Sequence, residues 1–281
     1  MSGSSFDTSK PSGSFPDTWK KPPFIKNKTL RWLVYLAVIL YFAAAFGTMD
    51  INWTRAYEGL PRGAEFIASF FPPTMIDSNG VDVSGTIVEG ILESIWMAIV
   101  ATVAGIILSV PIGLGASRNL APTPVYLFCR GIIASSRTFP EVILAIFAVK
   151  LFGFGSFAGL VALSIGTIGF FAKLLAEDIE ITAKSPNEAI ESTGAGWFQW
   201  VNYAIQPQVL PRMIGLSVYR LDINFRESAV VGIVGGGGIG ATLKTSFERY
   251  DFSISATILL SIIIIVMMLE YSSGYLRKWV Q

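Results

Sequence analysis

The chain has 281 residues, of which 52% are hydrophobic and only 15% are charged, and its mean hydropathy is +0.56. Because soluble domains carry about 25% charged residues, this composition indicates an integral membrane protein. The formal net charge of +1 argues against a nucleic-acid partner, and the lack of histidine excludes catalytic and metal sites built on imidazole. A single cysteine, Cys129, forms no intrachain disulfide, and we interpret it as a small apolar residue of a membrane helix.

The first 84 residues divide into a polar tail, one apolar span and a mixed segment. Residues 1–28 are rich in Ser, Pro, Thr, Gly and Lys, which predicts a disordered tail. Leu30–Thr48 is almost entirely apolar and is close to the length of about 20 residues that crosses a bilayer. Residues 29–84 therefore hold a first membrane helix and an extracytoplasmic segment, in which Gly63–Phe71 is a candidate short interfacial helix.

Residues 85–281 form the predicted membrane domain, with five further spans. These spans cover approximately residues 91–116, 125–152, 157–176, 209–226 and 254–271, and Pro140 interrupts the second of them. The sequence thus predicts an all-α, multi-pass protein of the inner (plasma) membrane with six spans. The positive-inside rule places both termini in the cytoplasm, because basic residues flank the first span at its N-terminal end and follow the last span: Lys20, Lys21, Lys26, Lys28, Arg31, Arg277 and Lys278.

The longest cytoplasmic connection in this topology, residues 177–208, predicts two short helices and a turn. Ser185 is a candidate N-cap, and Gly194 follows the end of the first helix. Trp197–Ala204 forms a second, amphipathic segment. Such a loop suits docking into a groove of a partner protein, and an ordinary interfacial helix is the alternative.

A short motif in this loop resembles the EAA loop of ABC-importer permeases: Glu188, Ala189, Ile190 and Gly194. The third position departs from the family pattern, since Ile190 stands where alanine is usual. The string YAIQPQVLPRMIGLSVYRLDINFRESAVVGIVGGGGIG, residues 203–240, is similar to the phosphonate, phosphite and phosphate permease branch of that family. The segment RTFPE, residues 137–141, is similar to the same branch, and the resemblance covers residues 85–281.

The resemblance implies the transmembrane subunit of a type I ABC importer, with Glu188–Gly194 as its coupling helix. It implies a homodimer, two ABC ATPase subunits on the cytoplasmic side and an extracytoplasmic solute-binding protein. ATP and Mg²⁺ would bind the ATPase subunits, because this chain has no G-x-x-x-x-G-K-[ST] motif and is not expected to be an enzyme. Closure of the ATPase would rock the spans between inward-open and outward-open states and move a phosphonate, phosphite or phosphate ion inward.

Charged side chains inside the predicted spans each cost at least about 2.5–3.5 kcal/mol to insert, so each needs a reason. The third span holds Arg137 and Glu141, and the fifth holds Arg220, Asp222 and Arg226. Two interpretations stay open. The arginines line the path of an oxyanion as guanidinium donors, or the charges pair at i,i+4, as Asp222 with Arg226 and Arg137 with Glu141.

The segment VVGIVGGGGIG, residues 230–240, matches G-x-G-x-x-G, the phosphate-binding turn of dinucleotide-binding folds. It lies between two predicted spans and lacks the acidic residue about 20 positions on, so we reject a cofactor site. Glycine permits positive φ and close backbone approach. The run therefore shapes an outer gate or offers N–H groups to an anion, and a tight turn for helix packing is the alternative. The candidate residues are Gly235, Gly236, Gly237, Gly238 and Gly240.

Two other classes of protein fit less well. A membrane-embedded enzyme acting on lipids or phosphoesters would need a nucleophile–base pair or a D-x-x-D carboxylate cluster, and the sequence offers neither, since its carboxylates at Glu177–Glu191 fit a solvated loop. An ion-coupled transporter or channel would tolerate broken, charged spans but gives no reason for the EAA-like loop. Within the permease family, the runner-up is a permease for another small solute such as methionine.

Overall fold

The computed structural model describes residues 25, 27–49, 52–77 and 79–280, with the backbone alone for residues 276–280. The predicted tail lies almost entirely outside the described residues. Residues 1–62 and 63–281 form two separate units, and each is described by itself.

The first unit contains α1, Lys28–Thr48, and the larger part of α2, Trp53–Ala68. Helix α1 begins at Lys28, which agrees with a tail that ends at about residue 28. The side-chain oxygen of Asn27 caps α1 by accepting a hydrogen bond from the Thr29 N–H at 3.2 Å. The predicted bounds Gly63–Phe71 are wrong for the second helix, because the apolar spacing that α2 follows starts ten residues earlier in the chain.

The second unit is a helical bundle. Its helices are α3 (Ser84–Gly115), α4 (Thr123–Thr138), α5 (Glu141–Phe152), α6 (Ser156–Glu180), α7 (Lys184–Glu191), α8 (Trp197–Trp200), α9 (Gln206–Val231), α10 (Gly238–Glu248) and α11 (Phe252–Val280). Single π-helical turns at 201–205 and 232–236 flank α9. The described part of the chain contains no β-strand, which confirms the predicted all-α class.

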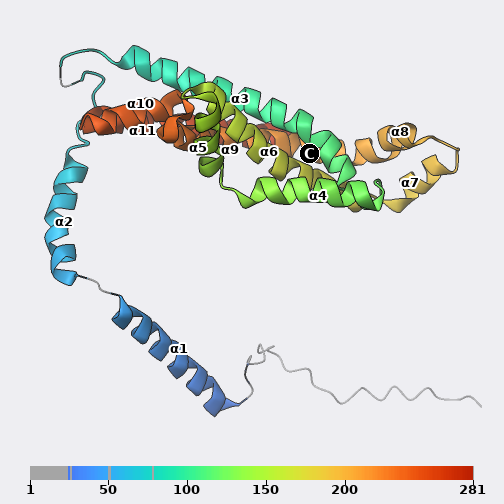
Figure 1. Ribbon diagram of the computed structural model, residues 1–281, viewed down its shortest axis with the longest axis horizontal. Coiled ribbons are helices and arrows are strands. Elements are labelled where there is room, and N and C mark those ends of the chain that lie inside the picture. The colour runs from blue at the N-terminus through green and yellow to red at the C-terminus, as the bar shows by residue number, and fades with distance from the viewer. Residues whose placement is uncertain (1–24, 26, 50–51, 78, 281) are drawn as a thin grey trace, which may run out of the picture. The chain divides into compact units, whose positions relative to one another are not determined.

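Helices α3 and α6 are the most extensively packed pair and run side by side through the bundle (Figure 1). Small residues permit this approach. A Cβ on Gly105 of α3 would overlap the Thr167 side chain of α6, and one on Gly113 would clash with Leu175. Close contact through small residues is how membrane helices gain packing energy, because lipid supplies no hydrophobic drive for helix association.

By length and composition, four of the described helices can cross a bilayer alone: α1, α3, α6 and α11. Helices α4 and α5 qualify only as a pair, and they are bent by 93° at the break between them. Helix α9 has 26 residues, but its charged side chains keep it outside this apolar class. The structure therefore supports four or five spans on this criterion, where the sequence predicted six. The difference lies in α9, which packs against α3, α6 and α11.

The two ends of the bundle carry different elements (Figure 1). At one end, α7 and α8 lie beside the turn from α3 to α4. There the Glu180 carboxylate accepts hydrogen bonds from the Arg118 N–H at 2.8 Å and from the Arg130 guanidinium at 2.9 Å. The opposite end carries the start of α3 and the turn between α10 and α11. Glu180 thus fixes the α3–α4 turn onto the last turn of α6.

The loop that leads into α3 is held by two carboxylates. Asp77 accepts hydrogen bonds from the N–H groups of Val81 at 2.9 Å and Asn79 at 2.8 Å, and the bond from Val81 is the main reason that the pKa of Asp77 is lowered. Asp82 accepts from the Ser84 N–H at 2.9 Å, which lowers its pKa too. Both carboxylates favour the ionised form that accepts these bonds.

Candidate functional site

The break between α4 and α5 lies at Pro140, inside a bent helix pair that is apolar enough to cross a membrane only when the two helices are taken together. Proline lacks an N–H and disfavours helix at the residue before it, so α4 ends at Thr138 and α5 begins at Glu141. Ser136, just before the break, donates a hydrogen bond to the Ile165 carbonyl of α6 at 2.5 Å. Ile165 lies about 14 Å along α6 from its first residue, so the break packs beside the middle of a helix that is long and apolar enough to cross a bilayer.

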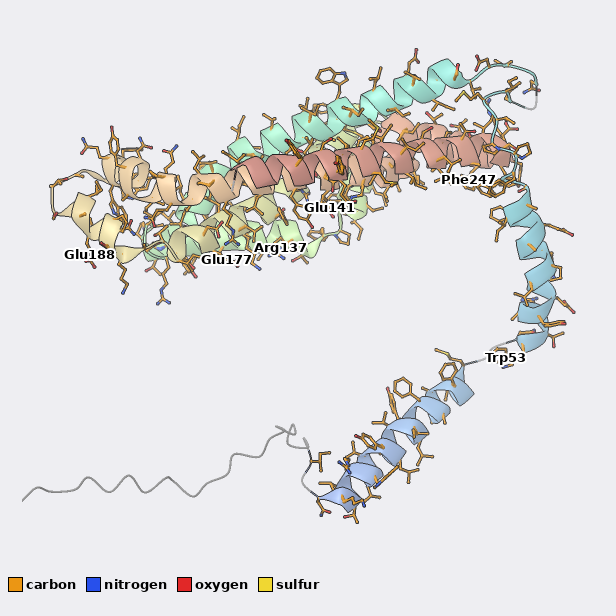
Figure 2. The ribbon with its side chains drawn as sticks, turned by 180° about the vertical axis from the view of Figure 1, so that it is seen from behind. Trp53, Arg137, Glu141, Glu177, Glu188 and Phe247 are labelled. Carbon is orange, nitrogen blue, oxygen red and sulfur yellow. The ribbon has the colours of Figure 1, made fainter. Side chains whose placement is uncertain are left out.

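This break is exposed on the surface of the single chain. Phe139 is 48% exposed, and its immediate neighbours are exposed as well. Figure 2 shows Arg137 and Glu141 near the middle of the bundle, with Glu188 toward one end and Phe247 toward the other. Non-helical backbone at membrane depth is tolerated only where protein covers it or where it lines a water-filled cavity. The break therefore marks a surface that lipid does not cover.

Glu141, the first residue of α5, pairs with Arg220 of α9 and not with Arg137. The Arg220 Nη2 donates to Glu141 Oε1 at 3.3 Å. The predicted pair Arg137–Glu141 is wrong, because i,i+4 side chains meet only along one continuous helix and Pro140 ends the helix between them. Gly166 of α6 makes room for the observed pair, since a Cβ there would clash with both charged groups.

Arg220 is the centre of a buried polar network. Its residue is only 3% exposed, its Nε donates to Thr167 Oγ1 at 3.0 Å, and its guanidinium lies 5.4 Å from the centre of the Phe170 ring. Asn224, one turn further along α9, donates to the hydroxyls of Thr102 at 2.7 Å and Thr167 at 3.0 Å. The network joins α3, α5, α6 and α9. Because the network encloses Arg220, this arginine holds the four helices together in the observed conformation.

The second predicted pair, Asp222 with Arg226, is confirmed. The Arg226 Nη2 donates to Asp222 Oδ2 at 2.7 Å. The Asp222 side chain is only 7% exposed, whereas that of Arg226 is 46% exposed. One arm of the Arg226 guanidinium is thus held by a buried carboxylate while much of the side chain remains accessible.

Arg137 stands apart from both pairs. It lies in the last turn of α4, where a cation interacts favourably with the C-terminal end of the helix dipole. Its aliphatic stem lies against Gly169 of α6, where a Cβ would clash with it. No hydrogen bond or ion pair joins its guanidinium to any residue that the structure describes. Within the described chain, the charge of Arg137 at the break is therefore uncompensated.

The glycine run forms a tight turn between α9 and α10. Gly235, Gly237 and Gly238 have φ values of +106°, +78° and +70°, a region that is costly for residues with a Cβ. The Gly235 carbonyl accepts a hydrogen bond from the Gly155 N–H at 3.0 Å, just before α6. The geometry is that of a packing turn, and the roles as an outer gate or an anion donor stay predictions.

Close backbone contacts hold this turn from both sides. Ser94 of α3 accepts a hydrogen bond from the Ile239 N–H at 2.9 Å. A Cβ on Gly240 would overlap the Ala229 carbonyl oxygen of α9, and a Cβ on Gly236 would overlap the Val231 side chain. Glycine at these positions is therefore a requirement of the packing.

Replacing Gly240 by alanine is expected to destabilise the protein by about 1–3 kcal/mol or more, because the new methyl group would force backbone atoms apart. The melting temperature and yield of the purified protein would measure the loss. Gly131→Ala is the matched control, because nothing lies within 4 Å of a Cβ at that helical position. Equal behaviour of the two variants would contradict the packing role.

The predicted N-cap of the loop helix is wrong. Helix α7 begins at Lys184, and the residue before it is Ala183, whose N–H donates to Gln208 Oε1 at 2.8 Å. Ser185 lies inside the first turn of α7 and not at its cap. The N–H group of Ala183 at the helix start is bound instead by the side chain of Gln208 of α9. Gly194 has a φ of +77° and follows the helix end, as predicted.

Helix α7 presents two different faces. Ile190 packs onto a hydrophobic cluster that includes Leu175 of α6 and Val209 of α9. Glu188 and Ala189 are exposed. One side of the helix is therefore anchored to the bundle, and the other is free at the end of the bundle that Figure 2 marks with Glu188.

Known proteins are similar in sequence to this chain over most of its length. Residues 101–281 match the family model described as the binding-protein-dependent transport system inner membrane component. The chain is 37% identical over 236 residues to the phosphate-import permease protein PhnE of Mycolicibacterium smegmatis, covering 84% of this chain and 43% of that one. It is 32% identical over 254 residues to the putative phosphite transport system permease protein HtxC of Stutzerimonas stutzeri, covering 90% and 88% of the two chains. The probable D-methionine transport system permease protein MetI of Vibrio cholerae is 28% identical over 193 residues, covering 63% and 84%.

The chain spans less than half the length of the first of these relatives. Among solved structures, an inward-facing crystal form of the MetNI methionine ABC transporter superposes with a TM-score of 0.62 at 23% identity, covering 69% of this chain and 96% of that one. This likeness shows the fold of a type I ABC importer permease. Together with the family match over residues 101–281, the relatives show that the chain belongs to the inner membrane components of binding-protein-dependent transport systems.

Proposed function

We propose that this chain is the permease subunit of an ATP-driven importer that carries a small phosphorus oxyanion, namely phosphonate, phosphite or phosphate, into the cytoplasm. Family membership supports transport, and the identities favour the phosphate and phosphite relatives over the methionine one. The observation that carries the choice of an anion is the uncompensated Arg137 at the α4–α5 break. A guanidinium presents a rigid fork of donors that matches the oxygens of a tetrahedral anion.

A second copy of the chain would complete the path. The exposed break lies at membrane depth, so protein or a water-filled cavity must face it. A two-fold homodimer brings the same surface of each copy to its axis, which would place two Arg137 side chains around one cavity. Arg226, whose side chain is 46% exposed, is the second candidate to contact the anion.

Energy would reach this chain from two separate ABC ATPase subunits that bind ATP and Mg²⁺. The exposed face of α7, with Glu188 and Ala189, would dock into a groove of one ATPase subunit. Ile190 on the opposite face contacts the cluster shared by α6 and α9, so a displacement of α7 would be passed to both helices. The docking end and both termini would then be cytoplasmic, and the solute-binding protein would deliver the anion at the opposite end.

Uptake by the assembled transporter in proteoliposomes tests the proposed solute class. With its ATPase and solute-binding protein present, we expect ATP-dependent uptake of phosphate, phosphite or methylphosphonate that D-methionine does not inhibit. Uptake of D-methionine without uptake of any of the three phosphorus compounds would overturn the proposal.

Replacing Ala189 by arginine is expected to abolish co-purification of the ATPase, because a long charged side chain would block the small exposed position on α7. Helix formation should be unaffected, since arginine is a good helix former. Thr123→Arg is the matched control, because Thr123 is also exposed and begins α4 on the same side of the bundle. Normal ATPase binding by Ala189→Arg would contradict docking through this face.

A further inference from the structure

Helix α2 has an apolar stripe on one face and charges on the other. Trp53, Tyr57, Leu60, Ala64 and Ile67 follow the spacing of one helical face, and the four large side chains are 64–79% exposed. The opposite face carries Arg55, Glu58, Arg62 and Glu65, with an ion pair of 3.8 Å between Glu58 and Arg62. An apolar stripe of this size on a helix marks a surface that binds another apolar surface.

Both ends of α2 are tied to the ends of helices that are long and apolar enough to cross a bilayer. Residues 49–52 alone connect α2 to α1, which is an apolar membrane-spanning candidate over its whole length. At the other end, the Phe66 ring lies 5.1 Å from that of Phe252 and 5.2 Å from that of Phe70. Phe252 is the first residue of the membrane-spanning α11. A helix tethered at both ends to the boundary of the bilayer is held along that boundary.

Helix α2 cannot itself cross the membrane. Its 16 residues extend about 24 Å, short of the hydrocarbon thickness of about 30 Å, and one of its faces is charged. It also contains Gly59, Pro61 and Gly63, from the two residue types that form helix least readily. A short helix of this composition depends on burial of its apolar face for its stability.

We propose that α2 is an interfacial helix that lies flat in the headgroup region of the bilayer with its stripe toward the acyl chains. Tryptophan and tyrosine at one end of the stripe are the aromatic residues that favour this region. The two arginines and two glutamates of the polar face cancel in charge, so the attraction to lipid comes from apolar area and needs no anionic headgroup. The inference goes beyond the transport role and does not depend on which solute is carried.

Site-directed spin labelling of the assembled transporter in phosphatidylcholine vesicles tests the proposal. Single cysteines are introduced in a Cys129→Ala background, with Tyr57→Cys and Leu60→Cys on the stripe and Glu58→Cys and Arg62→Cys on the polar face. Ile39→Cys in α1 gives the reference for a lipid-exposed site. Collision with oxygen, which concentrates in lipid, is compared with collision with a water-soluble nickel chelate.

Labels on the stripe, at positions 57 and 60, are expected to be several-fold more accessible to oxygen than to the chelate, like the reference label at position 39. Labels on the polar face, at positions 58 and 62, are expected to be more accessible to the chelate than to oxygen. Access of the chelate to all four α2 sites would overturn the proposal, because the stripe would then face water. Shielding of 57 and 60 from both reagents would also overturn it, since a protein would then cover the stripe.

Salt provides a second measurement, because a net-neutral face has no charge attraction to screen. The oxygen preference at 57 and 60 is expected to persist unchanged between low and high salt in neutral lipid. Its loss at high salt, or a requirement for anionic lipid, would contradict binding through apolar area.

Discussion

Replacing Arg137 by glutamine is expected to lower ATP-driven oxyanion uptake by roughly 10- to 100-fold while the complex assembles normally. The estimate rests on the loss of a charge-assisted hydrogen bond worth about 1.5–3 kcal/mol, with each ~1.4 kcal/mol equal to a tenfold change. Initial uptake rates in proteoliposomes measure the effect, and the yield and melting temperature of the complex measure assembly. Arg137→Lys is expected to recover only part of the rate, because it keeps the charge but loses the planar fork of donors.

Lys150 offers a matched control for this result. Like Arg137, it is an exposed cation in the last turn of its helix, in this case α5. If Arg137 served only the end of α4, both glutamine substitutions would cost about 1 kcal/mol or less in stability and leave uptake unchanged. We expect Arg137→Gln alone to impair uptake. Equal small effects, or loss of the assembled complex in Arg137→Gln, would contradict contact with the anion.

Features that depend on neighbours in sequence were predictable from the sequence. The apolar spans α1, α3, α6 and α11 follow from their composition. The Asp222–Arg226 pair follows from i,i+4 spacing in an unbroken helix, and the glycine turn follows from a run that only glycine tolerates. In each case the deciding signal lies in one continuous stretch of the sequence.

The polar core of the bundle was not predictable in this way. Arg220 and Glu141 are separated by 79 positions in the chain, and Asn224 reaches Thr102 across 122. The i,i+4 rule assigned Glu141 to Arg137 because it assumes a continuous helix, and Pro140 removes that continuity. Threonines in apolar spans are common, so Thr102 and Thr167 carried no signal of their own. The available clue was Asn224, one turn beyond Arg220 in a span already rich in charge.

Helix α9 connects the end of the bundle that carries α7 with the α4–α5 break. Its first turn contains Gln208, which accepts the N–H of Ala183 at the start of α7. Arg220 lies about 18 Å further along the same helix and holds Glu141, one residue after Pro140. A displacement of α7 therefore has a continuous helical route to the break, and the Arg220–Glu141 pair is the final link.

Removing Glu141 alone is expected to be far more damaging than removing both members of this pair. The Arg220 side chain is 4% exposed and that of Glu141 is 27% exposed. Glu141→Leu would strand a buried guanidinium, at a cost of about 3–5 kcal/mol. Arg220→Leu would strand a carboxylate that is partly exposed and can also bind a proton, so its cost should be smaller. The double substitution removes both charges and should recover much of the loss from Glu141→Leu.

Thermal unfolding of the three variants in detergent gives the order of stability, and the double-mutant cycle gives the coupling between the two residues. Uptake measurements then show whether the Arg220–Glu141 pair only stabilises the fold or also takes part in transport. If the pair passes motion from α9 to the break, the double variant should assemble and hydrolyse ATP with normal ATPase binding, yet transport several-fold less anion per ATP than the unaltered transporter. A double variant that is stable and transports as much anion per ATP as the unaltered transporter would show that the pair serves only to neutralise charge inside the membrane.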